Sequence, residues 1–219
     1  MSTKQRILDT ALSMFNEHGE RSVTTNHIAA RLEISPGNLY YHFKNKQAII
    51  FELFLAYEQR VSENLQVPED RQLTTTDKLN YLKNVFTGLW DYRFIHRDME
   101  HLLSSDETLR ARYRDFFQVC QQQVRKIYRG LGAAGMITVS EDDVDALALN
   151  TWILVTSWFS FLRCNLLTES QDEISQQMLW GGIYQVFTLE RPYLTDEYRE
   201  QIEELQQQLS PKPDWLVGS

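Results

Sequence analysis

The chain has 219 residues, of which 42% are hydrophobic, and a formal net charge of −8 at pH 7. This length and hydrophobic content exclude a largely disordered chain and are sufficient for a sizeable folded core. The two cysteines, Cys120 and Cys164, lie in largely apolar patterns with no CxxC pair or Cys/His cluster beside them. We therefore expect buried, reduced thiols, no metal and no cofactor. The amino-terminal segment lacks a continuous apolar run and a cleavage site, so we expect a cytoplasmic protein.

Charge is distributed unevenly along the chain. Residues 1–50 hold six of the 22 Lys and Arg but only four of the 30 Asp and Glu, so this segment is basic and the remainder is strongly acidic. The asymmetry favours nucleic acid at the amino-terminal end and repels it from the rest. A weakly basic module binds DNA weakly by itself, so we expect a homodimer that doubles the contacts.

The first two helices follow from apolar spacing. A helix is predicted from residue 2 or 3 to His18, ended by Gly19. A shorter helix follows, with Thr24 or Thr25 as its N-cap and an apolar face that contains Ile28. This face needs a partner, which the next helix can supply.

The third predicted helix starts at Ser35, with Pro36 at the position where a missing N–H costs nothing. Leu39 and Phe43 are four residues apart and form its inward face. The outward residues are small, hydrogen-bonding or aromatic. Such a helix can enter the major groove of DNA, because small residues let the backbone approach the bases.

These segments resemble the helix-turn-helix signature of the TetR family of bacterial transcriptional regulators. The resemblance covers roughly residues 5–55 and is carried by Val23, Thr24, Thr25, Ile28, Ala29, Ile34, Ser35, Gly37, Leu39, Tyr40, Tyr41, His42, Phe43 and Lys46. It implies an all-α fold with an amino-terminal three-helix DNA-binding domain and a larger carboxy-terminal helical domain for ligand binding and dimerisation. We expect residues 1–50, 51–209 and 210–219 to be these two domains and a tail.

The resemblance also implies which residues contact DNA. We expect base reading by Asn26, Gly37, Asn38 and Tyr41. Phosphate contacts are expected from Thr25, Tyr40, His42 and Lys46. The full set of expected DNA-contact residues is Thr25, Asn26, Ser35, Pro36, Gly37, Asn38, Tyr40, Tyr41, His42, Lys44 and Lys46.

One residue departs from the family pattern. Glu33 stands in the turn where the family often has glycine. Either the turn tolerates Glu33 in a strained backbone, at a cost of order 1 kcal/mol, or the geometry of the turn differs slightly. Its negative charge should point away from phosphate.

Further helices are predicted from about Lys46 to Glu63, after a Thr near position 76, after Asp106, after Ser140, from about 172 to 189 and from Asp196 to about Leu209. Residues 146–162 carry no charge. A membrane span needs roughly 20 apolar residues, so this run is too short, and we expect no membrane association. A helix apolar on all sides is more often buried by its own domain on one face and by a partner subunit on another. The expected dimer-interface residues are Trp158, Leu162, Met178, Gly182 and Val186.

Large aromatic residues in the second domain indicate an effector site. They exceed what a spacer requires, although a tightly packed aromatic core is equally compatible with the pattern. An apolar or aromatic molecule is the expected ligand. The expected pocket residues are Trp90, Phe94, His96, Trp152 and Phe159.

The sequence therefore predicts a transcriptional repressor that binds a palindromic operator and is released by a small molecule. An architectural or protein-docking DNA-binding protein of the same family, without an effector, is the alternative. An enzyme is not expected, because no phosphate-binding glycine loop, metal-ligand spacing or nucleophile elbow occurs.

Overall fold

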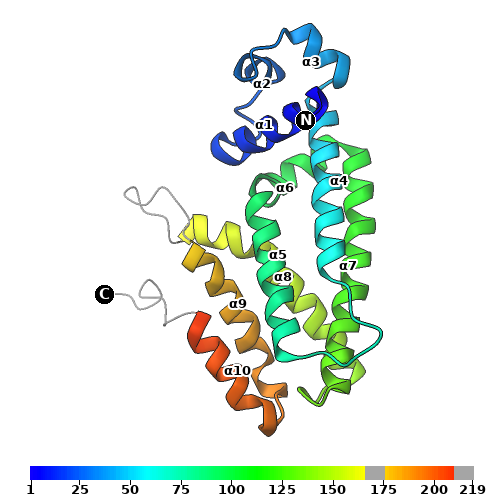
Figure 1. Cartoon of the computed structure of the whole chain (residues 1–219), viewed down its shortest axis with the longest axis vertical. Coiled ribbons are helices and arrows are strands. Elements are labelled where there is room, and N and C mark those ends of the chain that lie inside the picture. The colour runs from blue at the N-terminus through cyan, green and yellow to red at the C-terminus, as the bar shows by residue number, and fades with distance from the viewer. Residues whose placement is uncertain (166–175, 210–219) are drawn as a thin grey trace, which may run out of the picture. The chain divides into compact units, whose positions relative to one another are not determined.

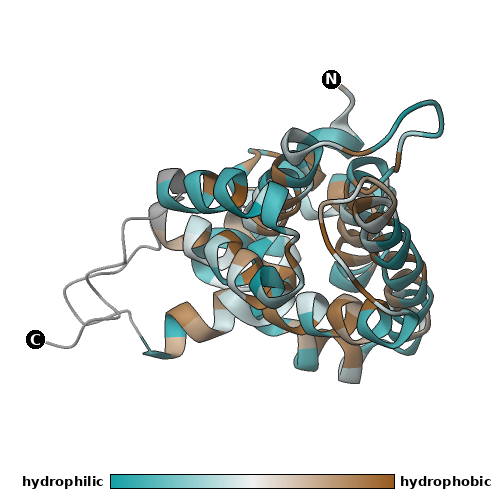
Figure 2. Ribbon diagram, turned by 90° about the horizontal axis from the view of Figure 1, so that it is seen from below, coloured by the Kyte–Doolittle hydropathy of each residue, from teal (hydrophilic) through white to brown (hydrophobic). Residues whose placement is uncertain are grey.

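A computed structural model describes residues 1–165 and 176–209, and the regular elements in these ranges are helices (Figure 1). This confirms the predicted all-α fold. The helices are α1 Thr3–His18, α2 Thr25–Arg31, α3 Pro36–His42, α4 Lys46–Asn64, α5 Thr75–Asp91, α6 Arg93–Ser105, α7 Glu107–Ala133, α8 Glu141–Asn165, α9 Gln176–Glu190, the short 3-10 helix η1 Arg191–Tyr193, and α10 Asp196–Leu209. Most ribbons carry both hydrophilic and hydrophobic stretches, as amphipathic helices should (Figure 2).

The chain forms two compact units. The first contains Met1–Val61 and Trp90–Phe116, and the second contains Ser62–Leu89 and Phe117–Ser219. The predicted domain boundary at residue 50 stays a prediction, and the expected tail at 210–219 lies outside the described residues, as does the predicted beginning of the helix near residue 172.

In the first unit, local sequence determines where α1 begins and ends. Ser2 caps α1, its hydroxyl accepting a hydrogen bond from the Gln5 N–H at 3.2 Å. Gly19 follows the helix with a φ of 88°, a conformation that side chains rarely adopt, and its N–H donates to the Phe15 carbonyl. Ile7 and Phe15 are fully buried on the inner face. The predicted bounds of this helix are confirmed.

The sequence did not predict α6 as a separate helix. Its beginning is held by Asn16 of α1, whose side chain accepts a hydrogen bond from the Phe94 N–H at 3.1 Å and donates one to the Asp91 carbonyl at 2.7 Å. The Phe15 and Phe94 rings pack at 5.2 Å between centroids. Long-range contacts to α1 therefore define where α6 starts.

The second unit contains two local capping boxes. Thr74 precedes α5 and Asp77 lies in its first turn. The Thr74 hydroxyl accepts from the Asp77 N–H, and the Asp77 carboxylate accepts from the Thr74 N–H. Ser140 and Asp143 do the same at α8, as predicted.

The core of this unit also holds polar groups from four helices. Lys78 of α5 pairs with Glu190 of α9, and the Tyr128 hydroxyl of α7 donates to Glu190 at 2.7 Å. Tyr128 also lies 2.6 Å from the Thr151 hydroxyl of α8. Burial, and then the charge of Glu190, raises the pKa of Tyr128 well above its ordinary value. We name Lys78, Tyr128, Thr151 and Glu190 the core polar network.

The structure differs from the predicted exposure of the dimer-interface residues and from the predicted burial of one cysteine. The five residues predicted for the dimer interface are buried within one chain. The reason is that α8 and α9 pack on each other, and Gly182 of α9 also lies against Phe86 of α5. Their place in a dimer interface stays a prediction. Cys120 is buried as expected, but Cys164 is exposed near the end of α8.

Among the described residues, α8 has the length and hydropathy to cross a membrane, a test that core helices of soluble proteins also pass. Eight of its residues are buried in the fold, and a capping box begins it.

Candidate nucleic-acid interface

The turn between α2 and α3 sets the orientation of the reading helix. Thr24 caps α2, its hydroxyl accepting from the His27 N–H at 3.2 Å, while His27 Nδ1 accepts from the Thr24 N–H at 3.4 Å. After α2, Glu33 has a φ of 57°, in the left-handed region. Of the two alternatives expected at this turn, the strained backbone at Glu33 is thus the one observed. The Ile34 N–H returns to the Ala29 carbonyl at 3.0 Å and closes the turn.

Packing of two apolar residues determines which face of α3 is exposed. Leu39 is fully buried and Phe43 is nearly so, as predicted. Ser35 caps the helix through the Asn38 N–H at 3.2 Å, with Pro36 in the first turn. The exposed residues of α3 are Pro36, Gly37, Asn38, Tyr40 and Tyr41, and His42 is half-buried.

The two tyrosines of α3 have different surroundings. Tyr41 is 85% exposed, and its ring meets only the edge of His42 among the ring contacts described. Tyr40 is 49% exposed, and its hydroxyl lies 3.1 Å from the Thr25 hydroxyl at the start of α2. The start of α2 and the middle of α3 thus present two adjacent hydroxyl groups at the surface. Hydroxyls of this kind commonly bind DNA phosphates.

The segment after α3 contains two lysines with different environments. Lys44 is exposed, and Asn45 caps α4 by accepting from the Ala48 N–H at 2.9 Å, as predicted. Lys46 Nζ lies 2.6 Å from Glu20 Oε1 and 3.0 Å from both the Glu20 and Val23 carbonyls. Its backbone N–H lies in the first turn of α4, where no helical carbonyl can accept it. A backbone N–H in the first turn of a helix is able to bind an anion.

All eleven residues predicted to contact DNA therefore lie between Thr25 and Lys46, from α2 to the first residue of α4, within the first unit. His27 lies in the same segment but is not among the predicted DNA-contact residues. Its Nδ1 accepts a backbone hydrogen bond, and the residue is exposed at the start of α2. In that tautomer the other ring nitrogen carries the proton and is a donor.

The five residues expected to line an effector pocket fall in separate units. Trp90, Phe94 and His96 belong to the first unit, whereas Trp152 and Phe159 belong to the second. Phe94, His96 and Phe159 are buried in the fold. His96 Nε2 lies 3.0 Å from the Tyr57 hydroxyl, and burial lowers the pKa of His96 from 6.5 to about 4.

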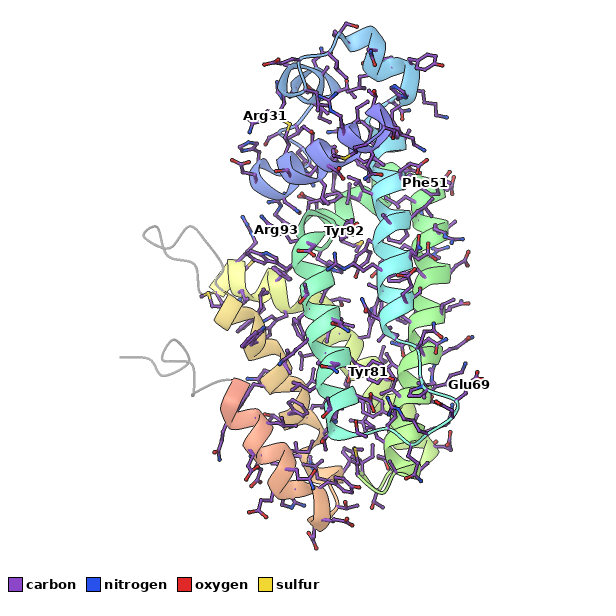
Figure 3. The ribbon with its side chains drawn as sticks, viewed as in Figure 1. Arg31, Phe51, Glu69, Tyr81, Tyr92 and Arg93 are labelled. Carbon is purple, nitrogen blue, oxygen red and sulfur yellow. The ribbon has the colours of Figure 1, made fainter. Side chains whose placement is uncertain are left out.

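The start of α6 also presents a stacked cation. The Arg93 guanidinium lies 4.4 Å from the centre of the Trp90 ring, next to Tyr92 (Figure 3). Arg93 also donates to the Trp90 carbonyl at 3.1 Å.

Comparison with known proteins identifies the class to which this fold and site belong. Residues 7–53 match the model of bacterial regulatory proteins of the TetR family, and residues 56–202 match a model described as a bacterial transcriptional repressor, also TetR. The class is that of helix-turn-helix transcriptional regulators of bacteria. The chain belongs to the TetR family.

Several individual proteins are similar to this chain. The solved structure of a TetR-family regulator from Marinobacter aquaeolei VT8 is 49% identical, with a TM-score of 0.88 over 96% of this chain and 100% of that one. The transcriptional regulator QacR of Staphylococcus aureus is 32% identical over 43% of this chain and 50% of QacR, so the chain spans about half the length of this curated relative. A complex of SmeT with triclosan shares the fold at 19% identity, with a TM-score of 0.59 over 90% of this chain and 93% of SmeT.

Proposed function

We propose that this protein is a homodimeric repressor that binds a palindromic operator and is released by a small apolar or aromatic effector. The observation that carries the proposal is the surface of α3. A short helix is capped and anchored through Leu39 and Phe43, and its exposed side combines Gly37 and Asn38 with Tyr41. A folded core does not require this combination, whereas it suits a helix that enters a major groove and bonds to base edges.

The roles of individual residues follow from exposure and chemistry. Asn26, Gly37, Asn38 and Tyr41 are proposed to meet base edges, because all four are exposed on α2 and α3. The remaining members of the predicted set, apart from Pro36, are proposed to position the protein on the backbone, since hydroxyls, imidazoles, ammonium groups and helix N-termini bind phosphate. They are Thr25, Ser35, Tyr40, His42, Lys44 and the backbone N–H of Lys46. Pro36 has no hydrogen-bond donor and is proposed only to start α3.

The dimer is proposed to form through the free side of α8. Leu149 and Ile153 are 46% and 52% exposed, four residues apart on one face, and Phe161 is exposed two turns further along the helix. Large apolar groups left in water on a helix whose opposite side is buried by its own chain are typical of a subunit interface. Dimerisation places two copies of α3 about 34 to 36 Å apart, one turn of DNA.

Release by an effector is proposed from family membership. SmeT, which shares the fold, is known in complex with triclosan, an observation about that protein. An effector lowers operator affinity only if it binds more tightly to a conformation in which the two α3 helices do not match the spacing of the operator. A preference of a few kcal/mol for that conformation is sufficient. Binding operator DNA places the protein in the cytoplasm, and repression requires only that the promoter be occupied.

Selection of bound sequences from a random DNA pool, with purified protein at physiological salt, tests the proposal. We expect a two-fold symmetric motif with one fixed half-site spacing. Binding to many unrelated sites would instead support the architectural alternative. Absence of DNA binding at any salt concentration would overturn both.

A further inference from the structure

The Lys46 ammonium group is fully engaged within the chain. A lysine has three N–H donors. Lys46 Nζ has three acceptors within 3.0 Å, namely the Glu20 carboxylate, the Glu20 carbonyl and the Val23 carbonyl. The Lys46 side chain is only 22% exposed. A phosphate can bind this ammonium only by displacing one of the three acceptors.

These acceptors lie next to the helix-turn-helix formed by α2 and α3, which we call the reader. Glu20 and Val23 both lie in the connection between the end of α1 and Thr24, the residue that caps α2. Lys46 opens α4, three residues after Phe43, the C-cap of α3. One side chain therefore fastens the residues before α2 to the residues after α3. The turn at Glu33 connects α2 directly to α3.

The Glu20 carboxylate is almost completely buried, and α6 contacts the same residue. Among the described residues, Glu20 Oε2 is a buried side-chain oxygen without a hydrogen-bond partner. His101 Nε2 of α6 lies 3.7 Å from it, and Asp98 of α6 accepts from the Glu20 N–H at 3.4 Å. A buried carboxylate needs a paired charge, which Lys46 supplies.

We propose that the Lys46–Glu20 pair is a positioning link that holds α2 and α3 in their DNA-reading arrangement, and that the Lys46 ammonium does not bind phosphate. This inference rests on the proposed function. It assigns Lys46 two separate roles: the backbone N–H faces DNA, while the side chain maintains the geometry of the reader. The neutralised Lys46 charge then makes no contribution to counterion release.

The salt dependence of DNA binding separates the two roles. The slope of log K against log salt falls by about 0.9 for each phosphate that a variant no longer neutralises. Lys44 is a matched control, because it is exposed and lies two residues away. We expect Lys44→Met to reduce the slope by about 0.9 per operator half-site, the effect of one phosphate. Lys46→Met should lower operator affinity by at least tenfold and leave the slope unchanged.

A double variant covers the case in which Lys46→Met fails to fold. Glu20→Met/Lys46→Met removes both charges, so no unpaired carboxylate remains buried. We expect it to regain most of the thermal stability that Lys46→Met loses, with the wild-type salt slope. The conservative Lys46→Arg should recover part of the operator affinity.

Two results would overturn the inference. The first is a salt slope that Lys46→Met or the double variant reduces as much as Lys44→Met does. The other is a double variant no more stable than Lys46→Met. Failure of the proposed function is recognised separately, because wild-type protein would then bind no duplex, whereas the stability comparison between single and double variants needs no DNA.

Discussion

Gly37 is a residue whose small size the fold does not require. A Cβ built on Gly37 would meet only the Ser35 hydroxyl, at 3.9 Å, and its backbone is not in the left-handed region. We expect Gly37→Ala to raise the free energy of unfolding by roughly 0.5–1 kcal/mol, because alanine is the better helix former. If Gly37 lets the backbone approach base edges, the same change should weaken operator binding about tenfold, or roughly 1.4 kcal/mol.

Equilibrium unfolding and a binding titration on one protein sample measure both effects of Gly37→Ala. A variant that gains stability and keeps its operator affinity would remove Gly37 from the base-reading residues.

His96 makes stability dependent on pH. Burial lowers its pKa from 6.5 to about 4, so the fold accommodates the neutral ring. As pH falls below 6.5, His96 is protonated in the unfolded chain, whereas in the folded chain it stays neutral until about pH 4. This contribution to stability is therefore complete above pH 6.5 and is lost between pH 6.5 and 4. We expect a loss of about 2 kcal/mol at pH 5 relative to pH 7.

Denaturant unfolding of wild type and His96→Gln at both pH values, at one protein concentration, checks this expectation. The variant should lose less stability on acidification. Equal pH dependence of the two proteins would show that His96 is not the responsible group.

At the scale of helices, Gly182 allows α9 to approach its neighbours. A Cβ there would lie 2.4 Å from the Phe86 ring of α5 and 3.0 Å from the Trp158 ring of α8, and all three residues are buried. Gly182 was expected at the dimer interface, but these neighbours belong to the same chain. Gly182→Ala should lower the free energy of unfolding by about 1–3 kcal/mol, because a packed core must shift.

Gly132→Ala is the matched control for this helix contact. It also lies in a helix, and its nearest neighbour would be Val139 at 3.7 Å, an ordinary contact. Thermal unfolding of the two variants at equal concentration should separate them, and similar melting temperatures would contradict the packing argument.

The helices could be predicted where their limits are local. Ser2, Thr24, Ser35 and Ser140 each cap a helix through a residue three positions ahead, and the sequence shows both partners. The start of α6 was missed because Asn16, which caps it, lies 78 positions earlier than Phe94.

The candidate site was predictable for the same reason, since its residues lie within one short segment. The engagement of Lys46 was not, because Glu20 is brought to it by tertiary packing. The buried dimer candidates show a further limit: an apolar helix face does not reveal whether its partner is in the same chain.

For the whole molecule, operator binding should depend on dimerisation through α8. Ile153→Glu places a charge in the proposed apolar interface, so we expect a monomer and an operator affinity at least tenfold lower, since one reader then binds alone. Sedimentation and operator titration measure the two effects. Thr138→Glu, at another exposed position of the second unit, is the control. An Ile153→Glu dimer of unchanged affinity would exclude this face.

The core polar network has a consequence for how the sequence can change over time. Removing one partner of a buried ion pair costs roughly 3–5 kcal/mol, whereas replacing both by apolar groups of similar volume is often neutral. Lys78 and Glu190 lie 112 positions apart and are paired in the core. When one of these two charged residues is replaced by an apolar residue, replacement of the other restores stability. Among descendants of a common ancestor, positions 78 and 190 should therefore be inherited as a charged pair or as an apolar pair, and mixed pairs should be short-lived.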